Sequence, residues 1–115
     1  MKCINKLLIN LMIFTIPSFA ISSTNVGTIL QIKAGPQSGS QAYIQLGGNA
    51  LAFENCQNNG TWHYSIDISG DMGKATLSLA LAAYTANKTV KIFGLDTCNN
   101  TTGVEDIDQL ILKDF

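Results

Sequence analysis

The sequence contains no arginine; its seven basic residues are all lysines, set against eight acidic residues. Without guanidinium groups the chain lacks the bidentate phosphate ligand and the commonest side-chain contact to guanine. The formal net charge of −1 also excludes a protein that binds nucleic acid mainly by electrostatic attraction. Charged residues make up only 13% of the chain, well below the average for globular proteins, so a charge-rich disordered tail is excluded too.

Histidine and cysteine are almost as scarce, which limits the chemistry that the chain can perform. His63 is the only histidine, and no nucleophile motif surrounds the nearby serines. The acidic residues mostly fall at expected strand ends or turns, where solvation and capping account for them. Two cysteines and one histidine in the expected domain are too few for an ordinary four-ligand zinc site. We therefore expect a protein that is not an enzyme and that uses no cofactor and no metal.

The first twenty residues have the pattern of a secretory signal peptide. Two lysines flank the start of an apolar run from Leu7 to Ile16, Pro17 ends it, and Ser18–Ala20 places small residues before the expected cleavage point. About ten clean apolar residues are too few for a membrane-spanning helix, which needs about 20. We expect residues 1–20 to be removed, and the protein to be secreted or periplasmic.

Residues 21–115 then form a single expected domain with a net charge near −3, because five lysines and eight acidic residues remain. Its two cysteines, Cys56 and Cys98, are an even number in an oxidising compartment, which favours a disulfide. Closing a loop of this length would stabilise the fold by about 4 kcal/mol in the chain-entropy model. The alternative is two separate buried thiols.

Hydrophobic periodicity predicts five strands with one helix between the third and the fourth. The expected strands are Val26–Ile32, Ala42–Leu46, Trp62–Ile68, Thr89–Leu95 and Ile107–Leu112. Apolar residues spaced three and four apart predict a helix over residues 71–86, with Ser69 or Asp71 as its N-terminal cap and Asn87 at its C-terminal end. This order is that of a β-rich α+β protein, a five-stranded OB-fold-like Greek-key barrel. A meandering sheet with one covering helix is the competing architecture.

Three finer expectations concern which faces are exposed. Val26, Thr28, Leu30 and Ile32 alternate, and so should share one face of the first strand. The acidic run of Glu105, Asp106 and Asp108 should form a solvated edge that discourages aggregation. The helix is apolar around much of its circumference, so we expect the sheet or a neighbouring subunit to cover it, unless the extra face is merely exposed alanine.

Aromatic rings and neutral amides are the residues that favour ligand binding. A sugar stacks its apolar face on a ring while its hydroxyls need uncharged partners. The candidate ligand-binding residues are Tyr43, Gln45, His63 and Trp62. Tyr43 and His63 fall opposite the apolar sets of their strands and should lie on the surface, whereas Trp62 shares its parity with Ile66 and should belong mainly to the core.

The stretch from Trp62 to Cys98 resembles secreted bacterial proteins similar to the B subunits of subtilase-type and pertussis-type toxins. The resemblance lies in the signal peptide, the Cys56 to Cys98 frame, the helical run Gly73–Ala83 and the following Asn87–Gly94. It implies an OB-fold that assembles in rings, usually pentamers, and binds cell-surface glycans while a separate A subunit carries the enzyme. No binding residue of that family is carried over, since the stretch before the third strand is shorter and differently composed.

Two interpretations follow. In the first, the protein is a ring-forming, glycan-binding module that forms a homo-oligomer through helix 71–86. In the second, it is a free-standing secreted or periplasmic OB-like domain that binds a protein partner or a small ligand. Neither involves nucleic acid or a membrane span after signal removal.

Overall fold

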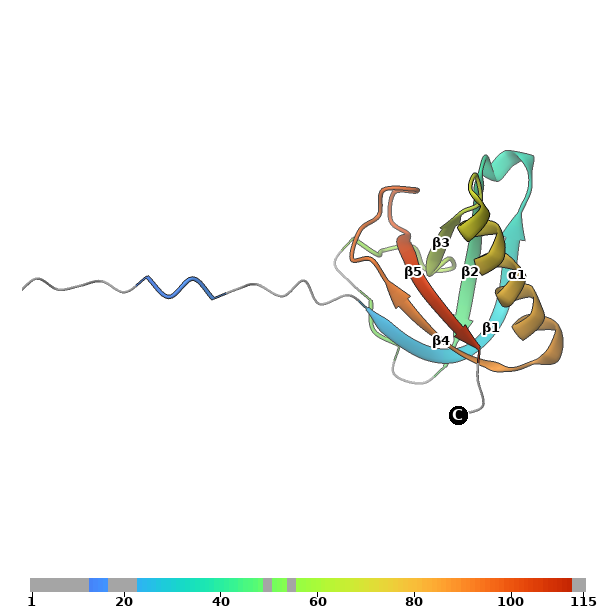
Figure 1. The fold of residues 1–115 in the computed structure, drawn as a ribbon, viewed down its shortest axis with the longest axis horizontal. Coiled ribbons are helices and arrows are strands. Elements are labelled where there is room, and N and C mark those ends of the chain that lie inside the picture. The colour runs from blue at the N-terminus through green and yellow to red at the C-terminus, as the bar shows by residue number, and fades with distance from the viewer. Residues whose placement is uncertain (1–12, 17–22, 49–50, 54–55, 113–115) are drawn as a thin grey trace, which may run out of the picture.

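The computed structural model describes residues 13–16, 23–48, 51–53 and 56–112. The chain is a β-rich α+β protein with a mixed five-stranded sheet and one α-helix (Figure 1). Its elements are β1 (Thr24–Ala34), a short 3₁₀ turn (Pro36–Ser38), β2 (Gln41–Gly47), β3 (Tyr64–Asp67), α1 (Asp71–Ala86), β4 (Thr89–Gly94) and β5 (Glu105–Leu112). The five predicted strands and the predicted helix are therefore all present in the predicted order.

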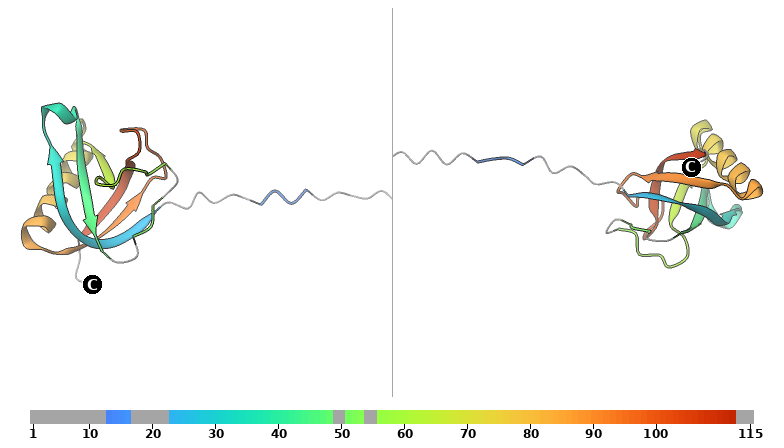
Figure 2. Two further views of the ribbon diagram at one scale, coloured as in Figure 1. Left: turned by 180° about the vertical axis from the view of Figure 1, so that it is seen from behind. Right: turned by 90° about the horizontal axis from the view of Figure 1, so that it is seen from below.

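The strand pairings close on themselves in the order β1-β2-β3-β5-β4. All pairs are antiparallel except β3 and β5, which run parallel through Tyr64 with Glu105 and Ser65 with Asp106. The second half of β1 pairs with β2 only, because its pairing with β4 ends at Thr28. Figure 2 shows the strongly curved β1 running from β4 across to β2.

The prediction of one alternating face along the first strand is wrong. The register between β1 and β2 shifts between Ile29 and Gln31, as at a β-bulge, which reverses the inward and outward positions beyond it. Ile29 thus lies in the core, whereas Val26 and Leu30 are exposed. A bulge also increases local twist, which helps one strand to curve between two partners.

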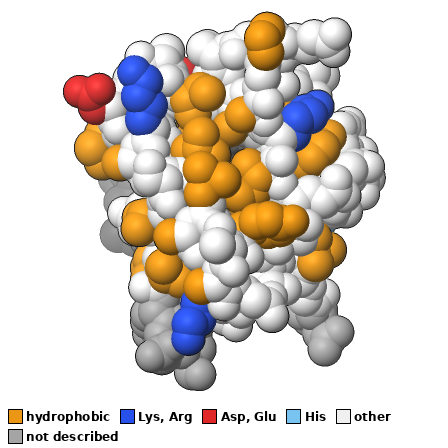
Figure 3. Space-filling view, turned by 90° about the vertical axis from the view of Figure 1, so that its right-hand side faces the viewer, with side chains coloured by type: hydrophobic (Ala, Val, Ile, Leu, Met, Phe, Trp, Pro, Cys, Tyr) orange, Lys and Arg blue, Asp and Glu red, His pale blue; other side chains and the backbone are white. Residues whose placement is uncertain are grey.

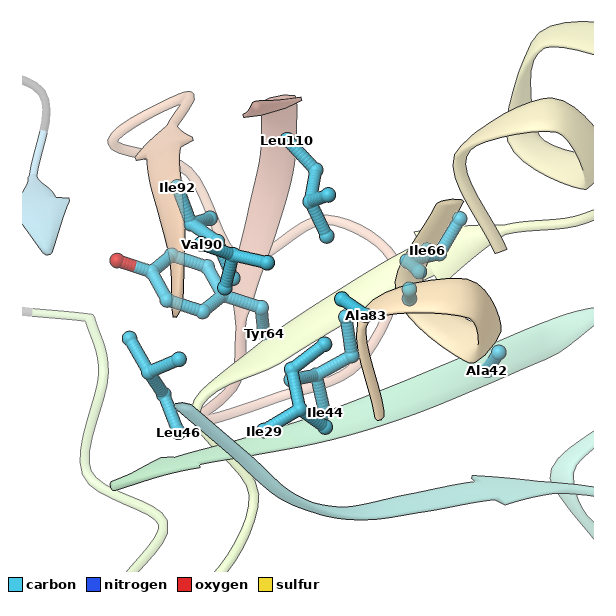
Figure 4. Packing of buried hydrophobic residues seen from close by; sticks show 11 residues of the cluster. Ile29, Ala42, Ile44, Leu46, Tyr64, Ile66, Ala83, Val90, Ile92 and Leu110 are labelled. Carbon is cyan, nitrogen blue, oxygen red and sulfur yellow. The ribbon is translucent and has the colours of Figure 1, made fainter. Parts of the chain in front are cut away.

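The predicted alternation is confirmed on the inner sides of β2, β3 and β4. Ala42, Ile44 and Leu46 of β2 are fully buried, and the inward residues of β3 and β4 meet them. The other members of this core are Ile29, Tyr64, Ile66, Ala80, Ala83, Val90, Ile92 and Leu110. Figure 4 shows the ring of Tyr64 directed into the space between the strands. The core is thus filled by aliphatic side chains from every strand and from α1, together with the ring of Tyr64.

The helix packs against β1, β3 and β5. A Cβ on Gly73 would collide with the carbonyl oxygen of Asp67, so glycine permits the first turn of α1 to approach the end of β3. Asn87 adopts the left-handed conformation at the C-terminal end, as predicted, with φ 51°. The predicted N-terminal caps are wrong: Gly70 occupies that position, and no side chain caps the helix.

Only alanines of α1, Ala80 and Ala83, are fully buried. Larger apolar side chains, Leu79, Leu81 and Tyr84, remain about half exposed. Figure 3 shows hydrophobic side chains gathered on this side of the molecule. The sheet therefore does not cover the helix completely, and the exposed face is more than alanine. Within the described residues, no helix has the length and hydrophobicity needed to cross a bilayer.

The acidic run at the start of β5 is not a solvated edge. Glu105 is fully buried and Asp106 is only 4% exposed, whereas Asp108 is exposed. Ser23 donates a hydrogen bond to the Glu105 carboxylate and also contacts the Tyr64 hydroxyl. Burial raises the pKa of Tyr64, so this phenol stays neutral and shares hydrogen bonds with Ser23 and Asn25 in the interior.

The Cys56–Cys98 disulfide is confirmed, with a Cα–Cα distance of 6.0 Å. Such a bond is typical of proteins that fold outside the reducing cytoplasm. The predicted signal peptide lies mostly outside the described residues and stays a prediction. The disulfide joins the segment before β3 to the loop between β4 and β5, and these two segments border the candidate site.

Candidate functional site

The outer side of the β1–β2 hairpin carries a group of rings and a lysine. Lys33 of β1 lies opposite Tyr43 of β2 in the register, and both alternate outward from the buried residues beside them. The ring of Trp62 lies 6.1 Å from that of Tyr43, centroid to centroid, at an angle of 47°. We call Lys33, Tyr43 and Trp62 the aromatic–lysine cluster.

The lysine ammonium contacts both rings. Lys33 Nζ lies 4.6 Å from the Tyr43 ring centroid and 4.9 Å from that of Trp62. Cation–π attraction at such distances contributes about 0.5–2 kcal/mol, depending on how far water is excluded. The ammonium therefore holds the two rings together on the outer surface of the sheet.

The expected exposure of Tyr43 is wrong, since only 8% of this residue is exposed. Tyr43 does point away from the core, but Trp62 and Lys33 cover its ring, and its hydroxyl hydrogen-bonds the Thr101 hydroxyl at 2.7 Å. Trp62 is half-buried and lies outside the core cluster, contrary to the expectation that it belongs to the core. Trp62 instead supplies the accessible ring of the group.

Gln45 extends the same outer row of β2. It faces Gln31 in the register, and Gln31 Nε2 donates to Gln45 Oε1 at 2.6 Å. This amide pair lies two residues from Lys33 along β1 and two residues from Tyr43 along β2, so it projects from the same side of the hairpin. Neutral hydrogen-bonding groups thus border the rings, as a sugar-like ligand requires.

His63 does not join this group, although it neighbours Trp62 in the sequence. Its Nδ1 accepts a hydrogen bond from the Leu46 amide at 3.0 Å, and its ring packs on Phe53 at 4.7 Å. Consecutive residues of an extended chain point to opposite sides, which separates His63 from Trp62. Burial lowers the pKa of His63, and an Nδ1 that accepts from an amide must be unprotonated.

The segment that carries Trp62 is fixed by side-chain amides. Gln57 Nε2 donates to the Trp62 carbonyl at 2.9 Å, while Gln57 Oε1 accepts from the Glu105 amide at 2.8 Å. Asn59 Oδ1 accepts from the amides of Thr61 and Trp62, at 2.9 and 2.8 Å. These bonds position Trp62 although it belongs to no strand.

The loop that carries Thr101 is fixed by one carboxylate. Asp106 Oδ2 accepts from the Thr97 hydroxyl at 2.6 Å and the Asn99 amide at 2.9 Å. Asp106 Oδ1 accepts from the Asn100 amide at 3.0 Å and the Ser65 hydroxyl at 3.3 Å. The carboxylate is thus fully hydrogen-bonded, which suits a structural role and leaves no lone pair evidently directed at a ligand.

A hollow of about 400 Å³ is lined by residues of this loop and of the first turn of α1. Asp67, Met72, Asn99 and Asp108 are among its lining residues, and none of the four predicted binding residues borders it. In the part of the chain that the structure describes, no group of three or more His, Cys, Asp or Glu side chains could hold a metal ion.

Comparison of the chain with protein-family models, with curated proteins and with solved structures gives no match in any of the three. The geometry of the described residues is therefore what points to a function. The structure brings Tyr43, Trp62 and Gln45 to one face and directs His63 elsewhere. Sequence reasoning missed Lys33 and Thr101, which complete that face.

Proposed function

We propose that this chain is a non-enzymatic binding module that holds a sugar-like ligand on the outer face of its β1–β2 hairpin. The observation that carries the proposal is the aromatic–lysine cluster bordered by neutral amides. A pyranose has an apolar face that can stack on the accessible Trp62 ring. Its hydroxyls can exchange hydrogen bonds with Gln31 and Gln45. Lys33 adds a donor beside the ring.

The fold that we propose is the five-stranded OB-fold, a Greek-key barrel with one helix. Support comes from the closed strand order, the parallel pairing of β3 with β5 and the position of α1 between β3 and β4. OB-folds bind oligosaccharides and oligonucleotides on the face of strands 2 and 3, between the loop after strand 1 and the loop after strand 4. The cluster lies on β2, and Thr101 of the β4–β5 loop borders it.

A fluorescence titration tests the ligand proposal, because Trp62 is the only tryptophan. A glycan array first selects the sugars, and the best of them is titrated into the folded, disulfide-bonded protein while Trp62 emission is followed. We expect binding to shift the emission. Trp62→Leu should weaken affinity about tenfold or more, which corresponds to ~1.4 kcal/mol.

Phe93→Leu is the matched control, since Phe93 is a partly buried ring on β4 that lies 5.1 Å from Lys91 Nζ, as the rings of the cluster lie against Lys33. It should leave affinity unchanged. A blank array, or equal losses in both variants with unchanged circular dichroism, would refute a sugar site at the cluster.

We further propose that the module assembles with copies of itself through α1, as in a ring-forming, toxin-B-like subunit that accompanies a separate A subunit. The half-exposed Leu79, Leu81 and Tyr84 support an interface there. A groove of about 410 Å³ runs between Leu81 and Ile32, beside the part of β1 that pairs with β2 only. Light scattering on the disulfide-bonded protein should show several chains; a strict monomer at micromolar concentration contradicts this step.

Leu81→Lys should dissociate the assembly, whereas Val26→Lys, at a similarly exposed apolar position on β1, should not. The same α1 groove favours the second candidate function, a free-standing secreted or periplasmic domain that binds a protein partner. Under that alternative the protein stays monomeric, the glycan array stays blank, and an envelope protein is recovered with the wild-type chain but not with Leu81→Lys.

A further inference from the structure

The turn before Trp62 contains an Asn-Gly pair, and neither the fold nor the proposed binding site uses the reactivity of that pair. Asn59 is followed by Gly60, both residues are exposed, and a Cβ added to Gly60 would meet no atom within 4 Å. Because Gly60 has no side chain, nothing on its own Cα hinders its amide nitrogen. An unhindered amide nitrogen directly after asparagine is the nucleophile for intramolecular attack on the side-chain amide.

The amide of Asn59 is held in an activating arrangement. Its Oδ1 accepts two backbone hydrogen bonds, from Thr61 N at 2.9 Å and Trp62 N at 2.8 Å. Both donors follow Gly60 in the chain, so the side-chain oxygen is held on the C-terminal side of the Asn59–Gly60 bond. If Gly60 N attacks Cγ, negative charge develops on Oδ1, where the two N–H donors already lie. Paired backbone donors of this kind stabilise tetrahedral intermediates of acyl transfer.

The main chain around Asn59 is anchored, so the arrangement persists. The amides of Asn58 and Asn59 both donate to the Gly103 carbonyl at 3.0 Å. Gln57 Nε2 donates to the Asn59 carbonyl at 3.1 Å. Holding the reacting groups in place reduces the entropy that their approach would otherwise cost.

We propose that Asn59 is a site of self-catalysed deamidation, which converts it to aspartate or isoaspartate. A bond forms between Gly60 N and Asn59 Cγ, the bond from Cγ to Nδ2 breaks, and the Gly60 proton leaves through solvent with the departing ammonia. Water then adds to either carbonyl of the cyclic imide and opens the ring. No oxidant, metal or enzyme is required.

The reaction alters the support of Trp62. Isoaspartate adds a methylene to the main chain three residues before Trp62, and it displaces the oxygen that the Trp62 amide now contacts. Deamidation also adds a negative charge near the cluster, where Lys33 is the cation that contacts the rings. We infer that the modified chain loses the present packing of Trp62 on Tyr43.

The test follows deamidation in the full chain with its disulfide intact, at mildly alkaline pH, by peptide mass spectrometry and an isoaspartate assay. The same chain unfolded in urea, with the disulfide kept, is the reference. We expect Asn59 to react fastest among the asparagines, and about tenfold faster in the folded chain than in the unfolded one. A folded rate equal to or below the unfolded rate overturns the proposed activation.

Gly60→Ala is the matched variant, because the added Cβ meets no atom and the fold should persist. It should slow reaction at Asn59 and leave the initial Trp62 emission unchanged. In the wild type, Trp62 emission should change in step with conversion. Conversion without any change in emission overturns the inferred effect on Trp62 while leaving the modification itself established.

Discussion

The disulfide-linked end of the molecule and the α1 face are held together by different forces. Around Trp62 and Thr101, a disulfide, side-chain amides and the Asp106 carboxylate fix segments that belong to no strand. The helix, in contrast, is held mainly by apolar packing of Ala80 and Ala83, and it leaves larger apolar side chains exposed. Hydrogen bonds fix the orientation of the side chains that a ligand site needs. Apolar packing alone tolerates substitution of residues at the surface.

Removing the disulfide should have the largest effect on this comparison. Cys56→Ser combined with Cys98→Ser releases a loop with a sequence separation of 42. The loss should be about 4 kcal/mol of unfolding free energy in the chain-entropy model. Urea denaturation of both forms measures it. A loss of only a few tenths of a kcal/mol would show that the hydrogen bonds alone hold the disulfide-linked end of the molecule.

Asp106→Asn comes next, because the amide cannot accept the four hydrogen bonds that the carboxylate accepts. We expect a loss of about 1.5–3 kcal/mol, the range for hydrogen bonds to a charged group. The control is Asp108→Asn, two residues away and exposed, which should change stability by less than about 0.5 kcal/mol. Equal losses would contradict the structural role of Asp106.

His63 adds a smaller, pH-dependent effect. Because burial lowers its pKa in the folded chain, the unfolded chain binds the proton first as pH falls below the unperturbed value of 6.5. Stability should thus be complete above that pH and decline below it, until the folded histidine also titrates. His63→Gln should flatten this part of a stability profile measured by denaturation at several pH values. An unchanged profile would assign the decline to other groups.

On α1, Leu81→Gln should have the smallest effect, about 0.5 kcal/mol for the monomer, since Leu81 is 47% exposed. Thermal unfolding at several protein concentrations checks it. If copies associate through α1, the stability lost by Leu81→Gln grows with protein concentration, because association stabilises the folded wild type. A loss as large as that of Asp106→Asn at low concentration would mean that α1 is held as rigidly as the disulfide-linked end.

The sequence predicts which residues of β2 lie on the face that carries the aromatic–lysine cluster, but not which other residues contact them there. Alternation around Ile44 placed Tyr43 and Gln45 on the outer side of their strand, and the structure agrees. A hairpin centred on the turn near Ser38 pairs Lys33 with Tyr43, so the sequence also contains a signal for this pair. The burial of Tyr43 could not be anticipated, since Trp62 and Thr101 reach it from segments without periodicity.

The burial of Glu105 and Asp106 could not be predicted from the sequence either. An acidic run is expected to be solvated, because burying a charge costs free energy unless hydrogen-bond partners compensate for the lost water. The partners of Asp106 come from the loop at Thr97–Asn100 and from Ser65, and no local pattern marks them. The bulge in β1 is similar: it follows from the need to pair with two strands, not from the residues at the bulge.

By itself the sequence determined the element order, the helix, the inward sides of three strands and the pairing of its two cysteines, because each depends on local periodicity or on counting. Only the tertiary structure decided which polar residues are buried, how β1 shifts its register and which side chains surround Trp62. Those outcomes depend on contacts between segments far apart in the chain, where the free energy of a residue is set by neighbours that the local sequence does not name.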